Sequence, residues 1–96
     1  MTLQELFAKD NSWTQGAGAR RADGSACQAG APTATQWCLM GGLTYCYPLG
    51  AVPLWVWVRL NELATRGMHY SDLVAWNDAP GRTIDDVRTL VKTAGV

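Results

Sequence analysis

The stretch "VPLWVWVRLNELATRG", residues 52–67, decides whether the fold is mostly helical. Its first half, Leu54–Val58, is aromatic and β-branched, which would also suit a buried strand. Its second half has helical spacing, with Asn61 expected on the outer side. The apolar stripe of this helix would consist of Val56, Leu60, Leu63 and Ala64. Pro53 suits a first helical turn, and Gly67 suits the position past the end. Because the polar half from Arg59 onwards has helical periodicity, we predict a helix and not a strand.

Two tryptophans within this stretch bear on function. On a helix, Trp55 and Trp57 would point to nearly opposite sides, because each residue turns the chain by about 100°. We therefore expect one of them not to share the core with the apolar stripe. Five tryptophans in 96 residues are a surplus for so small a core. The pattern therefore predicts an aromatic surface for a partner, unless loops bury both indoles.

The N-terminal third contains one clear helix and one turn. Thr2 and Glu5 form a capping box, which opens a short helix with Leu3, Leu6 and Phe7 on one face. The chain is then rich in Gly and Ala, with Asp23-Gly24 at the centre of that segment. Because Asp-Gly favours a two-residue type I′ turn, Ala19–Gln28 is predicted as a small hairpin. The poor β propensity of its flanks leaves an irregular loop as the alternative.

A second helix is predicted from Thr33, with Thr33 and Gln36 as another capping box, through Cys46. Gly41-Gly42 in its middle costs on the order of 1 kcal/mol per glycine relative to alanine. A helix tolerates this where another backbone must come close. We therefore expect another element to cross at these glycines.

The stretch "AWNDAPGRT", residues 75–83, has the composition of a corner between two helices. A short helix from Ser71 would end at Trp76, Pro80-Gly81 would turn the chain, and Thr83 would cap the last helix. Asp78 could pair with Arg82 across the turn.

The alternative for the same stretch is a polar pocket. In it, Asn77, Asp78 and Arg82 would hold a ligand beside the indole of Trp76. The pattern lacks the specificity of a phosphate loop or a metal motif. The corner is the favoured interpretation.

Together these patterns predict a mostly α fold: one domain over residues 1–96, with four or five short helices and one hairpin near residues 19–28. Apolar residues make up 48% of the chain and charged residues 17%, which is typical of a globular protein. The formal net charge is zero, so no overall field attracts nucleic acid. The start of the chain does not resemble a signal peptide, and Ala51–Val58 is too short to span a bilayer. We expect a soluble, cytoplasmic protein without a membrane partner.

The three cysteines, Cys27, Cys38 and Cys46, are odd in number and far apart. Together with His69 they lack the tight paired spacing of a zinc site. We expect buried small hydrophobic side chains, and neither a metal nor a cofactor.

The sequence contains two further candidate sites. Cys38 as nucleophile, His69 as base and Asp78 as orienting acid would make a small cysteine enzyme, provided that the imidazole lowers the pKa of the thiol. Alternatively, "GAGARRADG", residues 16–24, could cradle a phosphate, with Arg20 and Arg21 supplying charge. No lysine-serine pair follows these glycines, which favours a solvated arginine loop.

Several short motifs resemble those of a family of small uncharacterised proteins from bacteria and their phages. They are W-T-Q-G (13–16), A-R (19–20), D-G (23–24), W-C-x-x-G (37–41) and W-N-D-A-P-G-R-T-x-x-x-V (76–87). The segment 47–70 shows no such likeness. The resemblance implies a bacterial or phage setting and a shared framework around the tryptophan motifs. It implies no catalytic role.

The sequence thus predicts a non-enzymatic protein-binding module, whose partner is a host protein or a second copy in a homodimer. Nucleic acid is not an expected partner. By analogy, a phage protein of this kind would inhibit a host complex, as anti-CRISPR proteins do. The candidate binding residues are Trp55, Trp57, Trp76, Asn77, Asp78 and Arg82. The alternative function is the cysteine-dependent enzyme that uses Cys38 and His69.

Overall fold

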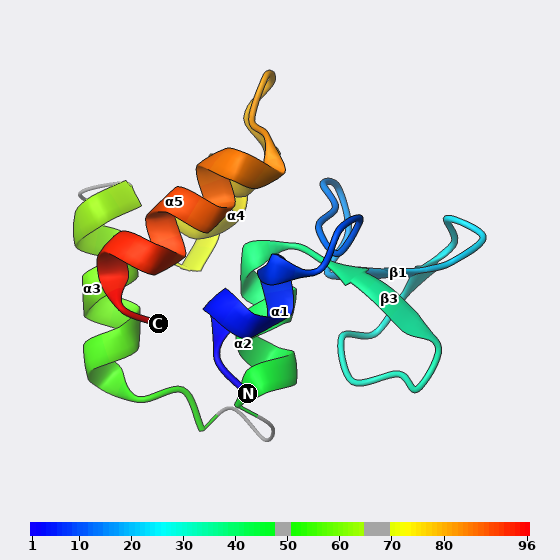
Figure 1. Ribbon diagram of the computed structural model, residues 1–96, viewed down its shortest axis with the longest axis horizontal. Helices are drawn as coiled ribbons and strands as arrows, with labels where there is room; N and C mark the ends of the chain where they lie inside the picture. The colour runs from blue at the N-terminus through cyan, green and yellow to red at the C-terminus, as the bar shows by residue number, and fades with distance from the viewer. Residues whose placement is uncertain (48–50, 65–69) are drawn as a thin grey trace.

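A computed structural model of the chain describes residues 1–47, 51–64 and 70–96, with the side chains of residues 70 and 71 left out. The described part contains five helices and one antiparallel sheet of three strands (Figure 1). The prediction of a mostly α fold with one short β element is confirmed. In chain order the elements are α1 (Leu3–Ala8), β1 (Ala19–Arg21), β2 (Ala26–Cys27), β3 (Ala34–Trp37), α2 (Leu39–Cys46), α3 (Leu54–Ala64), α4 (Tyr70–Asp78) and α5 (Ile84–Ala94).

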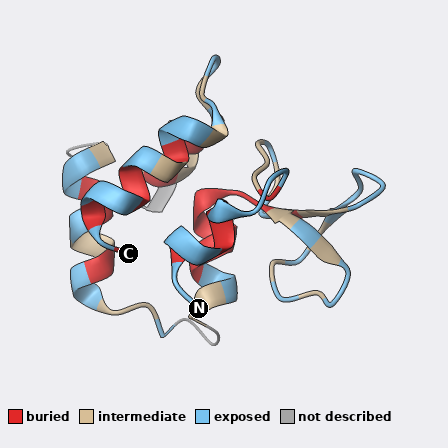
Figure 2. Ribbon diagram, in the orientation of Figure 1, coloured by how far each residue is buried: buried red, intermediate tan, exposed pale blue. Residues whose placement is uncertain are grey.

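The apolar core lies among the helices, while the sheet extends to one side of them (Figure 2). Helix α5 packs against both α1 and α3, and α4 packs against α2 and α3. The largest fully buried apolar side chains are Leu3, Leu6, Phe7, Leu39, Leu43, Val56, Leu60, Leu73, Val87 and Val91. Among the described helices, none has both the length and the apolar character needed to cross a bilayer.

Residues 54–64 form a helix, as predicted, and it packs against α4 and α5. The predicted apolar stripe was wrong for Leu63, which is 44% exposed. Val56 and Leu60 are fully buried. The prediction for Asn61 was wrong, since this side chain is also fully buried. Its Nδ2 donates to the carbonyl oxygen of Trp57 at 2.8 Å, so the amide finds a partner within its own helix. Gly67, the expected end of the helix, lies outside the described residues.

The caps of the first and last helices form as their residues predict. Thr2 and Glu5 exchange both bonds of a capping box, and Thr83 and Asp86 do the same at the start of α5. Gly95 ends α5 in the left-handed conformation, with φ of 74°.

The hairpin forms where it was predicted, but its turn differs from the expected type I′. Strands β1 and β2 pair with Ala19 opposite Cys27, and the Arg21 amide donates to the Ser25 carbonyl at 2.9 Å. The loop therefore has three residues between Arg21 and Ser25. Gly24 has a φ of 88°, whereas Asp23 has a negative φ. A type I′ turn needs positive φ at both central residues, so a three-residue turn with one left-handed glycine forms instead.

The predicted helix start at Thr33 was wrong. Residues Ala34–Trp37 form β3, which pairs with β1, and the helix α2 begins only at Leu39. The indole N–H of Trp37 donates to the carbonyl oxygen of Ala29 at 3.0 Å. Pairing with a strand 15 residues away therefore overrides the local capping pattern of Thr33 and Gln36.

The expected close approach at Gly41-Gly42 is confirmed. A Cβ on Gly41 would clash with the Gly18 carbonyl oxygen, so the backbone of residue 18 crosses α2 in close contact at this point. A Cβ on Gly42 would lie 2.9 Å from the ring of Phe7 in α1. The two glycines thus allow α2 to contact a loop and a helix at once.

Candidate functional site

Asn77 is the centre of a hydrogen-bonded junction that ties three distant segments together. It lies in the last turn of α4 and is fully buried. Its Oδ1 accepts from the indole Nε1 of Trp13 at 2.7 Å and from the amide of Leu39 at 2.9 Å. Its Nδ2 donates to the Thr14 carbonyl oxygen at 3.1 Å and to Oδ1 of Asp78 at 3.0 Å. All four positions of the amide are in use, which leaves Asn77 no capacity to bind a ligand.

The corner after α4 uses different contacts from those expected. The helix continues through Asn77 and Asp78 instead of ending at Trp76. Asp78 does not pair with Arg82, because its Oδ1 accepts from the Gly16 amide at 3.1 Å. The guanidinium of Arg82 stacks on the ring of Trp76, 4.0 Å from its centroid, and its Nε donates to the Trp76 carbonyl oxygen. The backbone turns at Gly81, with φ of 82°, as predicted.

The four residues of the predicted polar pocket therefore do not share one pocket. Trp76 and Arg82 line a shallow depression of about 290 Å³ between α3 and α5, while Asn77 is enclosed. Asp78 lies on another cleft. The structure supports the corner for most of this stretch and leaves Asp78 as the one member that faces a sizeable cavity.

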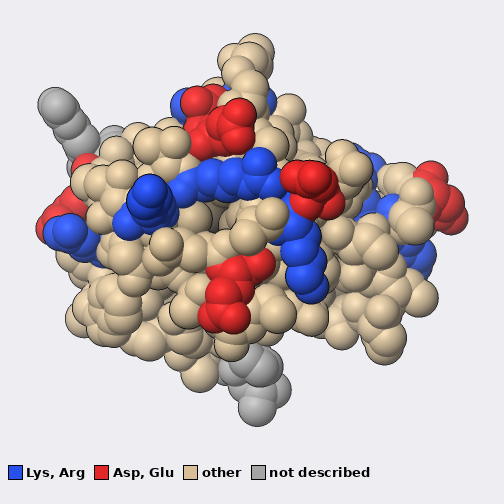
Figure 3. All heavy atoms as spheres, viewed as in Figure 1, with Lys and Arg blue, Asp and Glu red and all other residues tan. Residues whose placement is uncertain are grey.

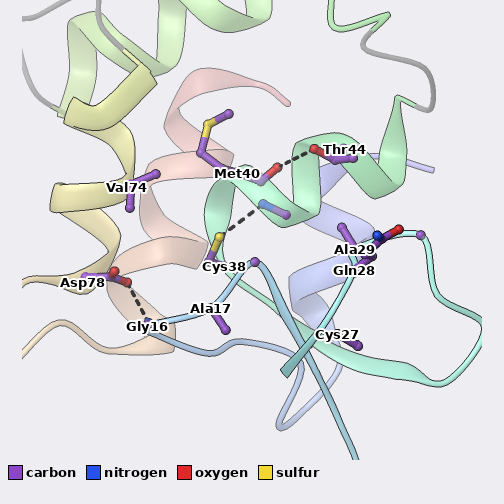
Figure 4. A pocket seen from close by; sticks show the side chains of 13 residues that line it. Gly16, Ala17, Cys27, Gln28, Ala29, Cys38, Met40, Thr44, Val74 and Asp78 are labelled. Atoms are coloured by element: carbon purple, nitrogen blue, oxygen red, sulfur yellow. Dashed lines mark hydrogen bonds between the residues drawn. The ribbon is translucent and has the colours of Figure 1, made fainter. Parts of the chain in front are cut away.

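That cavity, which we call the α2–α4 cleft, has a volume of about 670 Å³. Figure 4 shows Val74 and Asp78 of α4 on one side, Met40 and Thr44 of α2 on another, and residues 27–29 opposite them. The segment Gly16–Gly18 closes the remaining side. The cleft was not predicted from the sequence. The feature of the sequence that relates to the cleft is the cluster of small residues at 16–18. These residues lie close to Gly41 only in the folded chain.

Cys38 lines the α2–α4 cleft, but its surroundings oppose catalysis. It is the N-cap of α2 and not a mid-helix residue as expected, and its Sγ accepts from the Gly41 amide at 3.2 Å. Burial raises the pKa of the Cys38 thiol, and the negative charge of Asp78 raises it further. A catalytic thiol needs a lowered pKa. His69, the proposed base, lies outside the described residues.

The other cysteines are half-buried, and all three are free thiols. The prediction that all three are buried is therefore confirmed for Cys38 and wrong for Cys27 and Cys46. The described residues contain no group of three His, Cys, Asp or Glu side chains that could hold a metal ion.

Both arginines of the predicted phosphate loop are used within the protein. Arg20 donates to Thr14 Oγ1 and to the carbonyl oxygens of Gln15 and Gly24. Arg21 donates to Thr33 Oγ1, Ser25 Oγ and the Ala26 carbonyl oxygen. These bonds hold the hairpin in shape. Figure 3 shows Lys and Arg side chains lying beside Asp and Glu side chains on the face in view, without a large cationic patch.

The outer face of α3 consists of Leu54, Trp55, Val58, Arg59 and Glu62. Leu54 is 74% exposed and Trp55 is 58% exposed. Trp57, on the opposite side of the helix, is half-buried and packs against the core. The prediction that these two indoles point to different sides is therefore confirmed, and Trp55 is the one that faces solvent.

A family model described as a family of unknown function, DUF6197, matches residues 4–95 of the chain. Apart from Leu3, the first residue of α1, the matched region includes all the described helices, and it contains both tryptophan motifs, at Trp37 and at Trp76. No curated protein and no solved structure matches the chain.

Proposed function

The chain belongs to DUF6197, a family of unknown function, so we propose a function from its own surface: it is a non-enzymatic module that binds another protein through the outer face of α3. The observation that carries this proposal is the exposure of Leu54 and Trp55 on adjacent positions of one helix. Large apolar side chains that stay in water are costly, and grouped ones mark binding surfaces. Tryptophan is among the residues that contribute most to binding free energy at interfaces.

The inner side of α3 packs against the rest of the protein. Val56 and Leu60 are fully buried, and the helix packs against α4 and α5. Trp55 lies on the other side, where it is 58% exposed and contributes little to the core. Folding therefore does not account for this side chain, which supports a role in binding.

The pattern on the outer face indicates the kind of partner. Leu54 and Val58 are one turn apart with Trp55 beside them, and Arg59 and Glu62 follow at the polar end. Such spacing suits a helix that lies in an apolar groove with charged groups at one end. An 11-residue helix is about 16 Å long, which is short for a standard interface of about 800 Å² per partner. The partner is therefore a protein with an apolar groove that encloses Trp55, with neighbouring elements adding area.

The setting of this interaction rests on the resemblance described above. In a bacterial or phage-infected cell, a cytoplasmic module of this kind would act by occupying a surface of a host complex. By analogy with phage inhibitors such as anti-CRISPR proteins, this binding would inhibit the host complex.

The test compares the wild type with Trp55→Ala in two measurements. Sedimentation velocity over a range of concentrations reports self-association, and affinity capture from a bacterial lysate reports other partners. We expect a specific complex with the wild type that Trp55→Ala loses. Because Trp55 is exposed, the variant should keep its fold, which its circular dichroism spectrum verifies.

Trp57→Phe is the matched control, since it alters the tryptophan on the opposite side of the same helix. It should bind like the wild type. The proposal is wrong if the protein stays monomeric and Trp55→Ala captures every protein that the wild type captures. A complex that is lost equally in both variants would assign binding to the helix as a whole and would also contradict it.

A further inference from the structure

We propose that the α2–α4 cleft binds a small, mostly apolar organic cation, such as an amine carried on an aliphatic or aromatic group. This site is separate from the outer face of α3, and the proposal does not depend on the protein-binding function. None of the residues that line the cleft belongs to α3.

The size and walls of the cleft suit a small organic molecule. Its volume of about 670 Å³ falls within the range of roughly 300–1,000 Å³ that is usual for ligand pockets. Most of its side chains are apolar or weakly polar, and they come from separate segments: Ala17, Cys27, Ala29, Cys38, Met40 and Val74. In Figure 4, Val74 of α4 and Met40 of α2 lie at the upper part of the cleft. The apolar part of a ligand would be covered by these side chains.

The cleft is held open by bonds between its walls. The Cys38 amide donates to the Gly18 carbonyl oxygen at 3.1 Å, which fixes the 16–18 segment to the start of α2. The Gly16 amide donates to Asp78 Oδ1 at 3.1 Å, which fixes the same segment to the end of α4 (Figure 4). A site formed in advance loses little conformational entropy when a ligand binds.

Charge selects the class of ligand. Among the residues that the structure describes, Asp78 is the one charged residue that lines the cleft. It is also the last residue of α4, where the helix dipole favours a cation. Its Oδ1 accepts from Gly16 and Asn77, whereas its Oδ2 takes part in neither bond. The guanidinium of Arg20 lies next to Gly16 but is not among the groups that line the cleft. It donates to Thr14 Oγ1 and to the carbonyl oxygens of Gln15 and Gly24.

Two of the first three backbone amides of α2 are not free to bind an anion. The N-terminus of α2 reaches the cleft, and helix N-termini attract anions. Here the Leu39 amide already donates to Asn77 Oδ1, and the Gly41 amide donates to Cys38 Sγ. These amides are therefore not available to a carboxylate or a phosphate.

The experiment titrates the ¹⁵N-labelled protein with three probes of similar shape: 2-phenylethylammonium, 2-phenylethanol and 3-phenylpropionate. We expect the cation to shift the amide signals of Ala17, Gly18 and Gly30 and to bind most tightly. Since a nearby unit charge changes affinity by about fivefold in a solvent-exposed site, Asp78→Asn should weaken the cation by about that factor and leave the alcohol unchanged. An asparagine can still accept from Gly16, so the variant keeps the wall contacts.

Glu62→Gln is the control for charge, because it removes the same charge from a residue outside the cleft. A second readout uses the wild type alone: bound cation should slow the alkylation of the half-buried Cys27 thiol, and the propionate should not. The proposal is overturned if the three probes bind equally, if the shifts lie away from the cleft, or if no probe shifts any signal at its solubility limit.

Discussion

Polar side chains usually lie at the surface of a protein and large apolar ones in its core. The Asn77 junction and the outer face of α3 depart from this rule in opposite ways. Asn77 is a polar side chain with no exposed surface, whereas Trp55 is a large apolar side chain that is 58% exposed. The polar group is buried because every one of its hydrogen-bonding positions has a partner inside the protein. The indole on α3 gains no comparable contact from the fold. The comparison teaches that a polar motif can be purely structural while an apolar run carries the binding surface.

The largest effect that tests this comparison is expected at the junction. Asn77→Ala would leave the Trp13 indole N–H, the Leu39 amide and the Thr14 carbonyl oxygen without their buried partner. Each such group costs about 1–3 kcal/mol, so we expect the free energy of unfolding to fall by at least about 3 kcal/mol. Urea unfolding followed by tryptophan fluorescence measures this loss.

Asn77→Asp is the companion variant, because it keeps the oxygen that accepts from Trp13 and Leu39. It should lose less stability than Asn77→Ala at a pH where the new carboxyl is protonated. A loss of under about 1 kcal/mol for Asn77→Ala would show that water or a shift of the chain replaces these bonds, and that the junction is not structural.

A smaller loss is expected where α2 meets the 16–18 segment. Gly41→Ala places a Cβ against the Gly18 carbonyl oxygen, which forces the backbones apart. Because the obstacle is backbone and not a flexible side chain, the cost should lie at the upper end of the range for overpacking, about 3 kcal/mol. The gain in helix propensity offsets about 1 kcal/mol, so we expect a net loss of about 2 kcal/mol in chemical unfolding.

Gly30→Ala is the matched control for Gly41→Ala. A Cβ on Gly30 would meet nothing within 4 Å, and its φ is not positive. Its stability should stay within about 0.5 kcal/mol of the wild type. Equal losses of stability at both positions would mean that the Gly18 backbone does not restrict the size of the side chain at position 41.

The pH dependence of stability tests the burial of Cys38. Because burial raises the pKa of this thiol above its ordinary value, its contribution is fully present below about pH 8 and is lost as the pH rises through 9 and beyond. The unfolded chain would then release a proton that the folded chain retains. Cys46, whose pKa is also raised by burial, acts in the same direction.

The measurement is the free energy of unfolding at several pH values between about 7 and 10, for the wild type and for Cys38→Ala. The difference between the two proteins should shrink as the pH rises. A difference that stays constant would mean that the Cys38 thiol titrates normally in the folded protein.

The smallest effect on stability is expected on the outer face of α3. Trp55→Ala should change the free energy of unfolding by less than about 0.5 kcal/mol, because the side chain contributes little to the core. Trp57→Ala should cost clearly more in the same thermal or urea unfolding, since Trp57 packs against the core. If Trp55→Ala proved as costly as Trp57→Ala, the exposed indole would be part of the fold and the comparison would fail.

The parts of the fold that the sequence predicts are those with local signals. Capping boxes at Thr2 and Thr83, the spacing of Val56 and Leu60, and the paired glycines at 41–42 all lie within a few residues of the structure they predict. The strand β3 was missed because its partner, β1, is 15 residues away and its own residues suit a helix start.

The candidate sites were predicted less well, because their partners are distant in the sequence. Nothing near Asn77 indicates that it bonds to Trp13 and Leu39, so its polar neighbours gave the appearance of a pocket. The α2–α4 cleft has walls from separate segments, and no single motif contains more than a few of its residues. Helical geometry, in contrast, predicts that Trp55 and Trp57 point to different sides, and the structure identifies Trp55 as the exposed one.

The Asn77 junction also has a consequence for the order in which the chain folds. Its bonds join residues that are 64 and 38 positions apart in the sequence, so most of the chain must be confined before they can form. The capped helices α1 and α5, in contrast, can form from local contacts. We therefore expect the junction to assemble late, after helix formation, and to limit the folding rate more than any helix does. A chain stalled before this step would leave the indole N–H of Trp13 without the oxygen of Asn77 as its acceptor.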